Sequence, residues 1–249
     1  MSGTTDILFA GDVHGRFDHL ITTVRDYRPR ALVLLGDLEA PEPLTAMMAP
    51  LEALGTDVWF IPGNHDTDSA ASWQHPEDRA DRNLHGRVVT IAGLRIAGLG
   101  GVFRGEIGDP TQEARYPSYA DYQARARPRR TLPHGTGEAP QKAVGRLLKH
   151  RSSIFPDVYE RLLTSAADIL VTHEAPSCHP YGFTAIDKLA RALGVTRLFH
   201  GHHHDSRDYR VFEGVLGFRA FGVGLRGLCD SEGHLVRPGE RAPARVQKT

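Results

Sequence analysis

Five short clusters of polar residues hold the side chains of this chain that could do chemistry together. They are Gly11-Asp12-Val13-His14-Gly15, Gly36-Asp37, Gly63-Asn64-His65-Asp66, Val171-Thr172-His173-Glu174 and His200-Gly201-His202-His203-His204. Their carboxylates, amide and imidazoles are ligands that divalent transition metals take in proteins. Each cluster directly follows an apolar run that is typical of a strand. The sequence therefore predicts a centre for two metal ions, built where strands end.

Three apolar runs predict the strands that end at the first three clusters. These runs are residues 6–10, 31–35 and 58–61. Apolar spacing between them predicts helices over about 17–24 and 43–54. Strands that alternate with helices indicate a parallel sheet, whose ligands lie at the carboxyl ends of the strands. Asp12, Asp37 and Asn64 all fall at such ends.

The later part of the chain continues this alternation. We expect a hairpin of strands 88–91 and 94–99, helices over 156–165 and 186–193, strands over 169–172 and 197–199, and closing strands over 209–212 and 217–223. The hairpin brings antiparallel pairs, so the sheets are mixed. The expected organisation is a single α/β domain over residues 1–230. Residues 231–249 are polar and rich in glycine and proline, which predicts a loosely ordered tail.

Residues 101–151 interrupt the pattern with arginines, tyrosines and prolines. This basic insertion holds ten basic and five acidic side chains, a local balance of +5, and a short helix is expected from about residue 118. Arginines interleaved with Tyr116, Tyr119 and Tyr122 could hold a nucleotide or a nucleic-acid end. We favour a lid or an oligomer contact over nucleic acid.

Composition excludes several classes of protein. The 249 residues carry 30 basic and 30 acidic side chains, so no whole-molecule field attracts nucleic acid or an anionic membrane. No apolar segment approaches the length of a membrane span, and two cysteines make no disulfide framework, so a cytoplasmic protein without a membrane partner is expected. Cys178 lies five residues after His173 and could be a thiol ligand. We favour an ordinary loop cysteine.

The order and spelling of the five clusters resemble the calcineurin-like metallophosphoesterases, a family of two-metal phosphoester hydrolases. The resemblance runs from residue 6 to residue 204. It implies two mixed β-sheets packed face to face with helices outside. It also implies that His65 faces the substrate, where it would act as the general acid that protonates the leaving oxygen. The metal ligands it implies are Asp12, His14, Asp37, Asn64, His173, His202 and His204.

The residues also suggest how these ligands divide between two metals. Side chains two apart in an extended segment share a side, which would place Asp12 and His14 on the first metal. A carboxylate has two oxygens, so Asp37 can bridge cations held about 3.5–4 Å apart. By the resemblance, Asn64 and His173 bind the second metal.

The histidine-rich cluster follows the same rule of alternation. His202 and His204 would share a side, and His203 would point away. By the resemblance, His202 completes the second metal and His204 the first. We interpret His200 and His203 as hydrogen-bonded or solvent-facing histidines without a role in the site.

The charge and softness of these ligands indicate which metals and substrate fit. With Asp12 and Asp37 as the only anionic ligands, two divalent cations leave the cluster at about +2, which attracts a phosphate. Mixed nitrogen and oxygen ligands suit manganese first, and also iron, zinc, cobalt or nickel. A water shared by both metals would supply hydroxide at neutral pH for in-line attack on phosphorus.

The second cluster departs from the family pattern. Many members read Gly-Asp-x-x-Asp, sometimes followed by Arg, and the second Asp orients the catalytic histidine. Position 40 is alanine here, and Glu39, Glu42 and Asp66 stay open as substitutes. The missing arginine and Asp66 argue against a protein serine/threonine phosphatase.

Another cation must therefore contact the phosphate, and Arg16 and Arg104 are the candidates. The motifs serve both diesters and monoesters, with phosphodiesterase slightly favoured over phosphomonoesterase. A nucleotide is one substrate that would fit. The alternative is a catalytically silent metal-binding scaffold or interaction protein on the same fold. Oligomeric state stays open.

Overall fold

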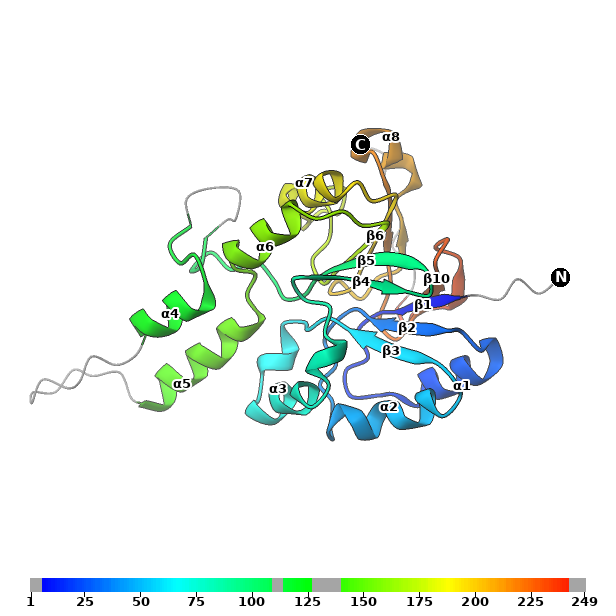
Figure 1. Cartoon of the computed structure of the whole chain (residues 1–249), viewed down its shortest axis with the longest axis horizontal. Coiled ribbons are helices and arrows are strands. Elements are labelled where there is room, and N and C mark those ends of the chain that lie inside the picture. Colours follow the sequence, from blue (N-terminus) through cyan, green and yellow to red (C-terminus); the bar gives the residue numbers. More distant parts are fainter. Residues whose placement is uncertain (1–5, 109–113, 127–139, 242–249) are drawn as a thin grey trace, which may run out of the picture.

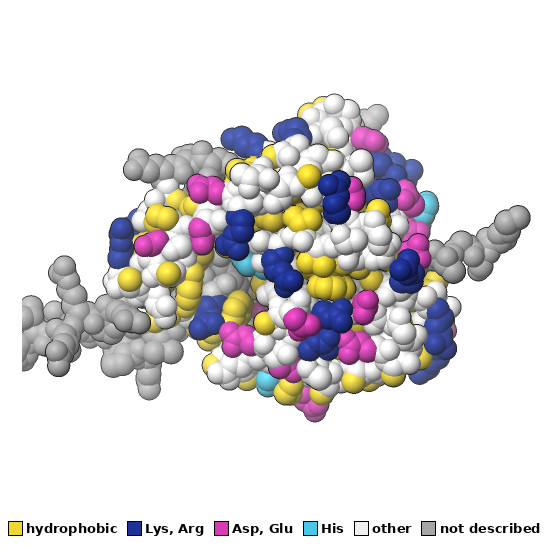
Figure 2. Space-filling model, viewed as in Figure 1, with side chains coloured by type: hydrophobic (Ala, Val, Ile, Leu, Met, Phe, Trp, Pro, Cys, Tyr) yellow, Lys and Arg dark blue, Asp and Glu magenta, His cyan; other side chains and the backbone are white. Residues whose placement is uncertain are grey.

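Two mixed β-sheets form the centre of the molecule, and helices cover their outer faces (Figure 1). The computed structural model describes residues 6–108, 114–126 and 140–241, with the backbone alone for 140–144. Within these residues, no helix combines the length and the apolar character that crossing a membrane requires. Figure 2 shows basic and acidic side chains interspersed over one face, in keeping with a formal charge of zero.

The first sheet holds the strands that lead to the first three clusters. Its order is β11 (Leu235–Arg237), β10 (Leu228–Asp230), β1 (Ile7–Ala10), β2 (Ala31–Leu34) and β3 (Asp57–Phe60). β1, β2 and β3 run parallel, and β10 is antiparallel to β1. β1 and β2 are apolar and buried throughout, as strands covered on both faces must be.

The second sheet holds the strands that lead to the two histidine clusters. Its order is β4 (Arg87–Ile91), β5 (Leu94–Leu99), β6 (Ile169–Thr172), β7 (Arg197–His200), β9 (Arg219–Gly222) and β8 (Arg207–Asp208). β5, β6, β7 and β9 are parallel, and β4 pairs antiparallel with β5. Ala92 and Gly93 both have positive φ, as a two-residue hairpin turn requires.

Three apolar layers hold the sandwich together. α1 (Asp18–Tyr27) and α2 (Leu44–Glu52) pack on the first sheet, and α6 (Pro156–Leu163) and α7 (Thr184–Leu193) pack on the second. Between the sheets, Phe9 stacks on Phe199 with ring centroids 4.0 Å apart. Alternate residues of each central strand therefore serve different layers, and the expected pair of face-to-face mixed sheets is confirmed.

The basic insertion contains a pair of helices that extend away from the sandwich (Figure 1). α4 (Tyr119–Ala126) confirms the helix expected there, and α5 (Pro140–Lys149) runs into a 3₁₀ turn, η3 (His150–Ser152). Tyr122 is buried with Ile107 and Phe155 in a small core of its own. Tyr122 is therefore unavailable to stack on a nucleotide.

The other insertion tyrosines are also engaged. Arg115 and Arg125 lie over the ring of Tyr116, and Arg151 lies over the ring of Tyr119. These contacts weaken the nucleic-acid interpretation of the insertion, because rings already covered by cations offer less stacking surface. Residues 109–113 and 127–139, which include several of its arginines, lie outside the described part of the chain.

One strand expected near the C-terminus is absent from the described structure. Residues 209–212 form no strand, because β8 ends at Asp208 and a 3₁₀ turn, η4 (Arg210–Phe212), leads into α8 (Glu213–Leu216). Asp208 Oδ1 accepts a hydrogen bond from the Arg210 backbone N–H, which turns the chain at the end of β8.

The first part of the tail, residues 231–241, forms a turn and a strand. Asp230 Oδ1 accepts hydrogen bonds from the backbone N–H groups of Glu232 and His234, and Gly233 takes a positive φ, so β10 turns back into β11. The glycine and polar residues that suggested disorder form this turn. Residues 242–249 lie outside the described part of the chain.

Candidate metal centre

The polar clusters lie at the carboxyl ends of β1, β2, β3, β6 and β7, where side chains from the two sheets come close together. Several non-glycine residues in these loops have positive φ: His14 at 42°, Asp37 at 48°, His202 at 72° and His204 at 62°. Such conformations cost free energy and collect at functional sites. The clusters are therefore not extended, and the alternation argument for their geometry was wrong. The tertiary fold, rather than strand pleating, brings the side chains together.

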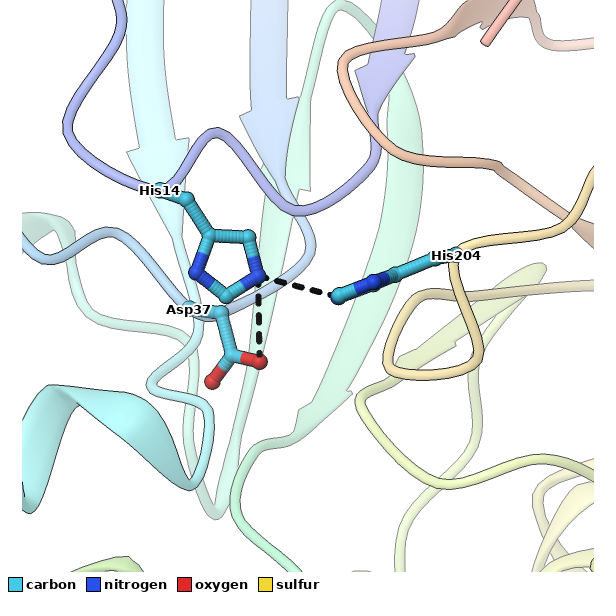
Figure 3. Close-up of side chains that lie close together, drawn as sticks. All are labelled: His14, Asp37 and His204. Carbon is cyan, nitrogen blue, oxygen red and sulfur yellow. Dashed lines mark hydrogen bonds and ion pairs between the residues drawn. The ribbon is translucent and has the colours of Figure 1, made fainter. Parts of the chain in front are cut away.

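One group of ligand atoms gathers around His14. Its Nε2 lies 2.9 Å from Nε2 of His204 and 3.8 Å from Oδ2 of Asp37 (Figure 3). Oδ2 of Asp12 lies 3.7 Å from Nε2 of His204. The side chains that the sequence analysis assigned to the first metal thus lie close together, with His14 and His204 in direct contact and Asp12 beside His204.

A second group gathers around His173, which is fully buried. Its Nε2 lies 3.4 Å from Oδ1 of Asp37 and 3.2 Å from Oδ1 of Asn64. The rings of His173 and His202 have centroids 4.8 Å apart, and the donor atoms of Asp37, His173 and His202 lie within 4.8 Å of one another. These are the donors assigned to the second metal.

Asp37 belongs to both groups. Its Oδ2 faces His14 and its Oδ1 faces His173, so one carboxylate lies between two sets of donors. The Oδ2 atoms of Asp12 and Asp37 are buried and have no hydrogen-bond partner within the described part of the chain. Buried carboxylate oxygens without partners are costly unless a cation is nearby, so the residues fit a pair of divalent metals.

Hydrogen bonds on the far side of two histidines fix which nitrogen faces the centre. His173 donates from Nδ1 to the carbonyl of Leu35 at 2.8 Å, and His14 Nδ1 lies 3.0 Å from Oε2 of Glu39. Both rings therefore present Nε2 to the centre, as metal-binding histidines with carbonyl or carboxylate partners do. Glu39 was considered as an orienting group for His65, but its short contact is with His14.

His65 lies at the rim of the centre, in the 3₁₀ turn η1 (His65–Thr67). Its ring centroid is 5.4 Å from that of His14, and its backbone N–H donates to Asp37 Oδ1 at 2.8 Å. Nδ1 of His65 lies 2.7 Å from Oδ2 of Asp68, against 3.9 Å from Oε1 of Glu39. Asp68, three residues along the chain, is therefore the carboxylate that contacts the His65 ring most closely among the described residues.

The other two residues considered as orienting groups for His65 do different things. Asp66 is buried and accepts from the backbone N–H groups of Gly63 and Glu39, both at 2.8 Å, so it ties the second and third clusters together. Glu42 is exposed. The sequence signal that could have found Asp68 is the three-residue spacing of a 3₁₀ turn after the histidine.

Comparison with known proteins agrees with this geometry. A family model described as calcineurin-like phosphoesterase matches residues 5–206. The chain belongs to the calcineurin-like phosphoesterase family. An uncharacterized protein of Haemophilus influenzae is 40% identical over 235 residues, which cover 92% of this chain and 96% of that protein. The crystal structure of TT1561 of Thermus thermophilus matches with a TM-score of 0.57 at 17% identity, covering 94% of this chain and 98% of that one. At this identity the structural likeness shows the fold alone.

In the absence of metal, the two carboxylates and His173 of this family member shift one another's pKa values. Burial alone would lower the pKa of His173, but the charges of Asp37 and Asp12 and the hydrogen bond to Asp37 raise it to about 10. Burial raises the pKa of Asp12 to about 6, against the opposing charge of His173. Burial would also raise the pKa of Asp37, but the charge and hydrogen bond of His173 hold it below its ordinary value. The metal-free centre is thus a protonated histidine between two carboxylates.

We expect metal binding to release protons. Below its pKa of about 10, the His173 ring carries a second proton. Metal must displace that proton, so the affinity for metal rises as pH rises. The expected slope is about tenfold per pH unit for each proton released, with one proton released near neutral pH and a second from Asp12 below about pH 6. Titration calorimetry of manganese into metal-stripped protein, in buffers of different ionisation enthalpy, measures this number. A release of no protons at pH 7 would contradict the proposed ligation by His173.

The contact of Asp68 with His65 carries a second prediction. Asp68→Asn should lower kcat by about 10–100-fold, the range for losing a partner that orients a site histidine, and should leave manganese affinity unchanged. Glu42→Gln is the matched control, because Glu42 is exposed and has no such contact with His65. Steady-state kinetics and manganese titration of both variants check this. Equal losses in the two variants would contradict a specific role for Asp68.

Glu174 is a site residue that sequence reasoning missed, although it directly follows His173. It is 3% exposed, its Oε1 accepts from the backbone N–H of Phe103 at 3.0 Å, and its Oε2 lies 3.9 Å from Nε2 of His202. Burial raises its pKa to about 7. Glu174 is therefore a buried acidic group near His202, but it makes no hydrogen bond to that ring like the one that Glu39 makes to His14.

The two histidines interpreted as bystanders lie beside the centre. His200 is buried in β7, and its Nε2 lies 3.2 Å from the hydroxyl of Tyr209. His203 stacks on His179 with centroids 3.8 Å apart. Cys178 is half-buried and belongs to none of the convergent donor groups found among the described residues.

The two candidate arginines have different surroundings. Arg16 is exposed. Arg104 is half-buried, donates to the hydroxyls of Ser153 and Ser152 at 3.1 and 3.0 Å, and interacts electrostatically with Glu174 and Asp68. Those two carboxylates follow His173 and His65 closely in sequence, so the guanidinium of Arg104 lies beside the site.

Proposed function

We propose that this protein is a metal-dependent phosphoester hydrolase. The observation that carries the proposal is the carboxylate of Asp37, whose two oxygens face two separate sets of metal donors. Two divalent cations held there would supply a hydroxide nucleophile at neutral pH and would offset charge on the phosphoryl oxygens. Manganese is the metal we propose first, because the donors mix nitrogen and oxygen.

The proposed ligands are those that the two groups bring together. The first metal would be held by Asp12, His14 and His204, and the second by Asn64, His173 and His202, with Asp37 between them. Asp12 and Asp37 are the carboxylates among them, which leaves the loaded centre positive and attractive to a phosphate.

His65 is the proposed general acid. Its Nδ1 bonds to Asp68, which orients the ring and leaves Nε2 to give a proton to the leaving oxygen. Burial would lower the pKa of His65, but the hydrogen bond to Asp68 and the nearby carboxylate charges raise it above its ordinary value. The hydrogen bond to Asp68 and the carboxylate charges therefore favour the protonated ring that a general acid requires.

Among phosphoesters we propose diesters ahead of monoesters, with nucleotides as a fitting class. Tyr181 is 75% exposed, and its ring centroid lies 6.1 Å from that of His203, beside the centre. Phe183 is also exposed and contacts Phe103, the neighbour of Arg104. Aromatic rings near the phosphate site offer contacts to a substituent beyond the phosphorus, which a diester or nucleotide provides.

Hydrolysis of two chromogenic substrates tests the proposal. Metal-stripped protein would be assayed with p-nitrophenyl phosphate and bis-p-nitrophenyl phosphate, with and without manganese. Manganese-dependent turnover supports the hydrolase, and the preferred substrate separates monoester from diester chemistry. Tight manganese binding without cleavage of either substrate would favour the silent scaffold instead.

A further inference from the structure

A chain of hydrogen bonds joins Arg104 to the basic insertion. Arg104 Nε donates to Ser153 Oγ at 3.1 Å, Ser153 Oγ lies 2.9 Å from His150 Nδ1, and His150 Nε2 lies 3.1 Å from Glu106 Oε2. His150 and Ser153 are 1% and 2% exposed, so water does not compete for these bonds. None of the four residues belongs to the metal donors.

The chemistry of the partners fixes the direction of each proton. Arg104 can only donate, so Ser153 Oγ accepts from it and gives its own proton to His150 Nδ1. The ring then carries its proton on Nε2 and donates it to the carboxylate of Glu106. Burial lowers the pKa of His150, which keeps the ring in the neutral form that this arrangement needs. All the bonds therefore point one way, from the guanidinium to the carboxylate.

A second set of bonds holds the other edge of the guanidinium. Arg104 Nη2 donates to Ser152 Oγ, which lies 2.8 Å from Thr67 Oγ1, and Thr67 donates to the backbone carbonyl of Asn64 at 3.0 Å. Asn64 is a proposed ligand of the second metal. Fixed at two edges, the plane of the guanidinium is set relative to the metal centre.

The direct partners of Arg104 in these two sets are neutral. Two serine hydroxyls hold the guanidinium. Ser153 and His150 separate it from the carboxylate of Glu106 in the series of hydrogen bonds. A carboxylate in direct contact would use the charge of the arginine in an ion pair. The serines orient the group without such an ion pair, and the carboxylates of Glu174 and Asp68 act on it electrostatically without a hydrogen bond among the described residues, so the guanidinium can still bind an incoming anion.

We propose that Glu106 and His150 are positioning residues that act through Ser153 to hold Arg104 for binding the substrate phosphate. This inference rests on the proposed function and names a role for the insertion in it. Glu106 follows β5, and His150 follows α5 and packs on Tyr122 of α4 with ring centroids 4.5 Å apart. The insertion core therefore supports an arginine of the active site.

The test measures phosphate affinity in a mutant cycle. Inorganic phosphate would be titrated into manganese-loaded wild type, Arg104→Ala, Glu106→Ala, His150→Phe and the double variants that combine Arg104→Ala with each of the other two. Glu106 has a side chain 44% exposed, so its variant should fold even if the buried His150→Phe does not. Tyr122→Phe is the matched control, because it removes only the 3.3 Å bond from Tyr122 to the other oxygen of Glu106.

We expect Arg104→Ala to weaken phosphate binding by about 10–100-fold, as for loss of a hydrogen bond from a charged group. Glu106→Ala and His150→Phe should each weaken it by about 3–10-fold, and neither should add to the loss in the Arg104→Ala background. Tyr122→Phe should stay within about twofold of wild type.

Three results would overturn the inference. They are losses that add in full in the double variants, wild-type affinity in Glu106→Ala, and wild-type affinity in Arg104→Ala. Turnover of bis-p-nitrophenyl phosphate by the wild type, measured in parallel, separates these results from failure of the proposed function. If the wild type neither hydrolyses the diester nor binds phosphate, both proposals fall.

Discussion

Asp37→Ala is expected to abolish manganese-dependent hydrolysis. Asp37 is the one side chain shared by both groups of donors, so its removal takes a ligand from each metal. Charge stabilisation by a metal contributes several kcal/mol to a transition state, so the loss in kcat/KM should be about 10³-fold or more. Steady-state kinetics at saturating manganese measures it.

The same variant should lose its thermal response to metal. At about 100 times the dissociation constant, a ligand stabilises the folded state by about 2.7 kcal/mol, which raises Tm by about 5–10 °C in a chain of this size. We expect this shift in the wild type and little of it in Asp37→Ala. Asp57→Ala is the control, since Asp57 begins β3, at the end opposite the site, and its side chain is 65% exposed. An unchanged shift in Asp37→Ala would argue against the bridging role.

His65→Gln is expected to slow hydrolysis to a degree that depends on the leaving group. A general acid contributes about 10²–10⁴-fold when the leaving oxygen needs a proton. The p-nitrophenolate group leaves readily without a proton, so the rate for p-nitrophenyl esters should fall only slightly in His65→Gln. The rates for alkyl and sugar phosphoesters should show the full effect. Rates for a series of aryl and alkyl esters, compared between wild type and His65→Gln, measure this dependence.

Two comparisons make this test specific. His234→Gln removes a histidine whose side chain is 77% exposed and should leave every rate unchanged. Manganese affinity should be the same in His65→Gln and the wild type, because His65 is not among the proposed ligands. A uniform loss across all leaving groups would point to a binding role for His65 instead of proton transfer.

Much of the fold could be predicted because its central strands are unambiguous. Runs such as residues 7–10 and 169–172 are wholly apolar or nearly so and end in glycine or in polar clusters, so their position is set locally. The strand expected over 209–212 was wrong because the apolar signal there comes mainly from Tyr209, whose buried ring precedes a 3₁₀ turn. One buried aromatic residue beside polar residues fits a turn as well as a strand. Periodicity over four residues cannot separate the two.

The candidate donors could be chosen from their clusters, and the structure brings them close together, but most of the residues that contact them could not be chosen in this way. Glu39 contacts His14 from 25 residues away, a contact that depends on how the loops fold back. Asp68 contacts His65 within a local turn, but acidic residues beside a cluster are common without any role. The positive φ angles of His14 and His204 are likewise not predicted by any pattern in the sequence, because non-glycine residues rarely take them without support from the surrounding structure.

The proposed ligands come from both sheets. Asp12, Asp37 and Asn64 follow strands of the first sheet, and His173 and His202 follow strands of the second, more than a hundred residues later. A metal pair held by such ligands would fasten the two halves of the sandwich and close a long loop of chain. The supply of metal would then govern the folding and lifetime of the protein as well as its chemistry.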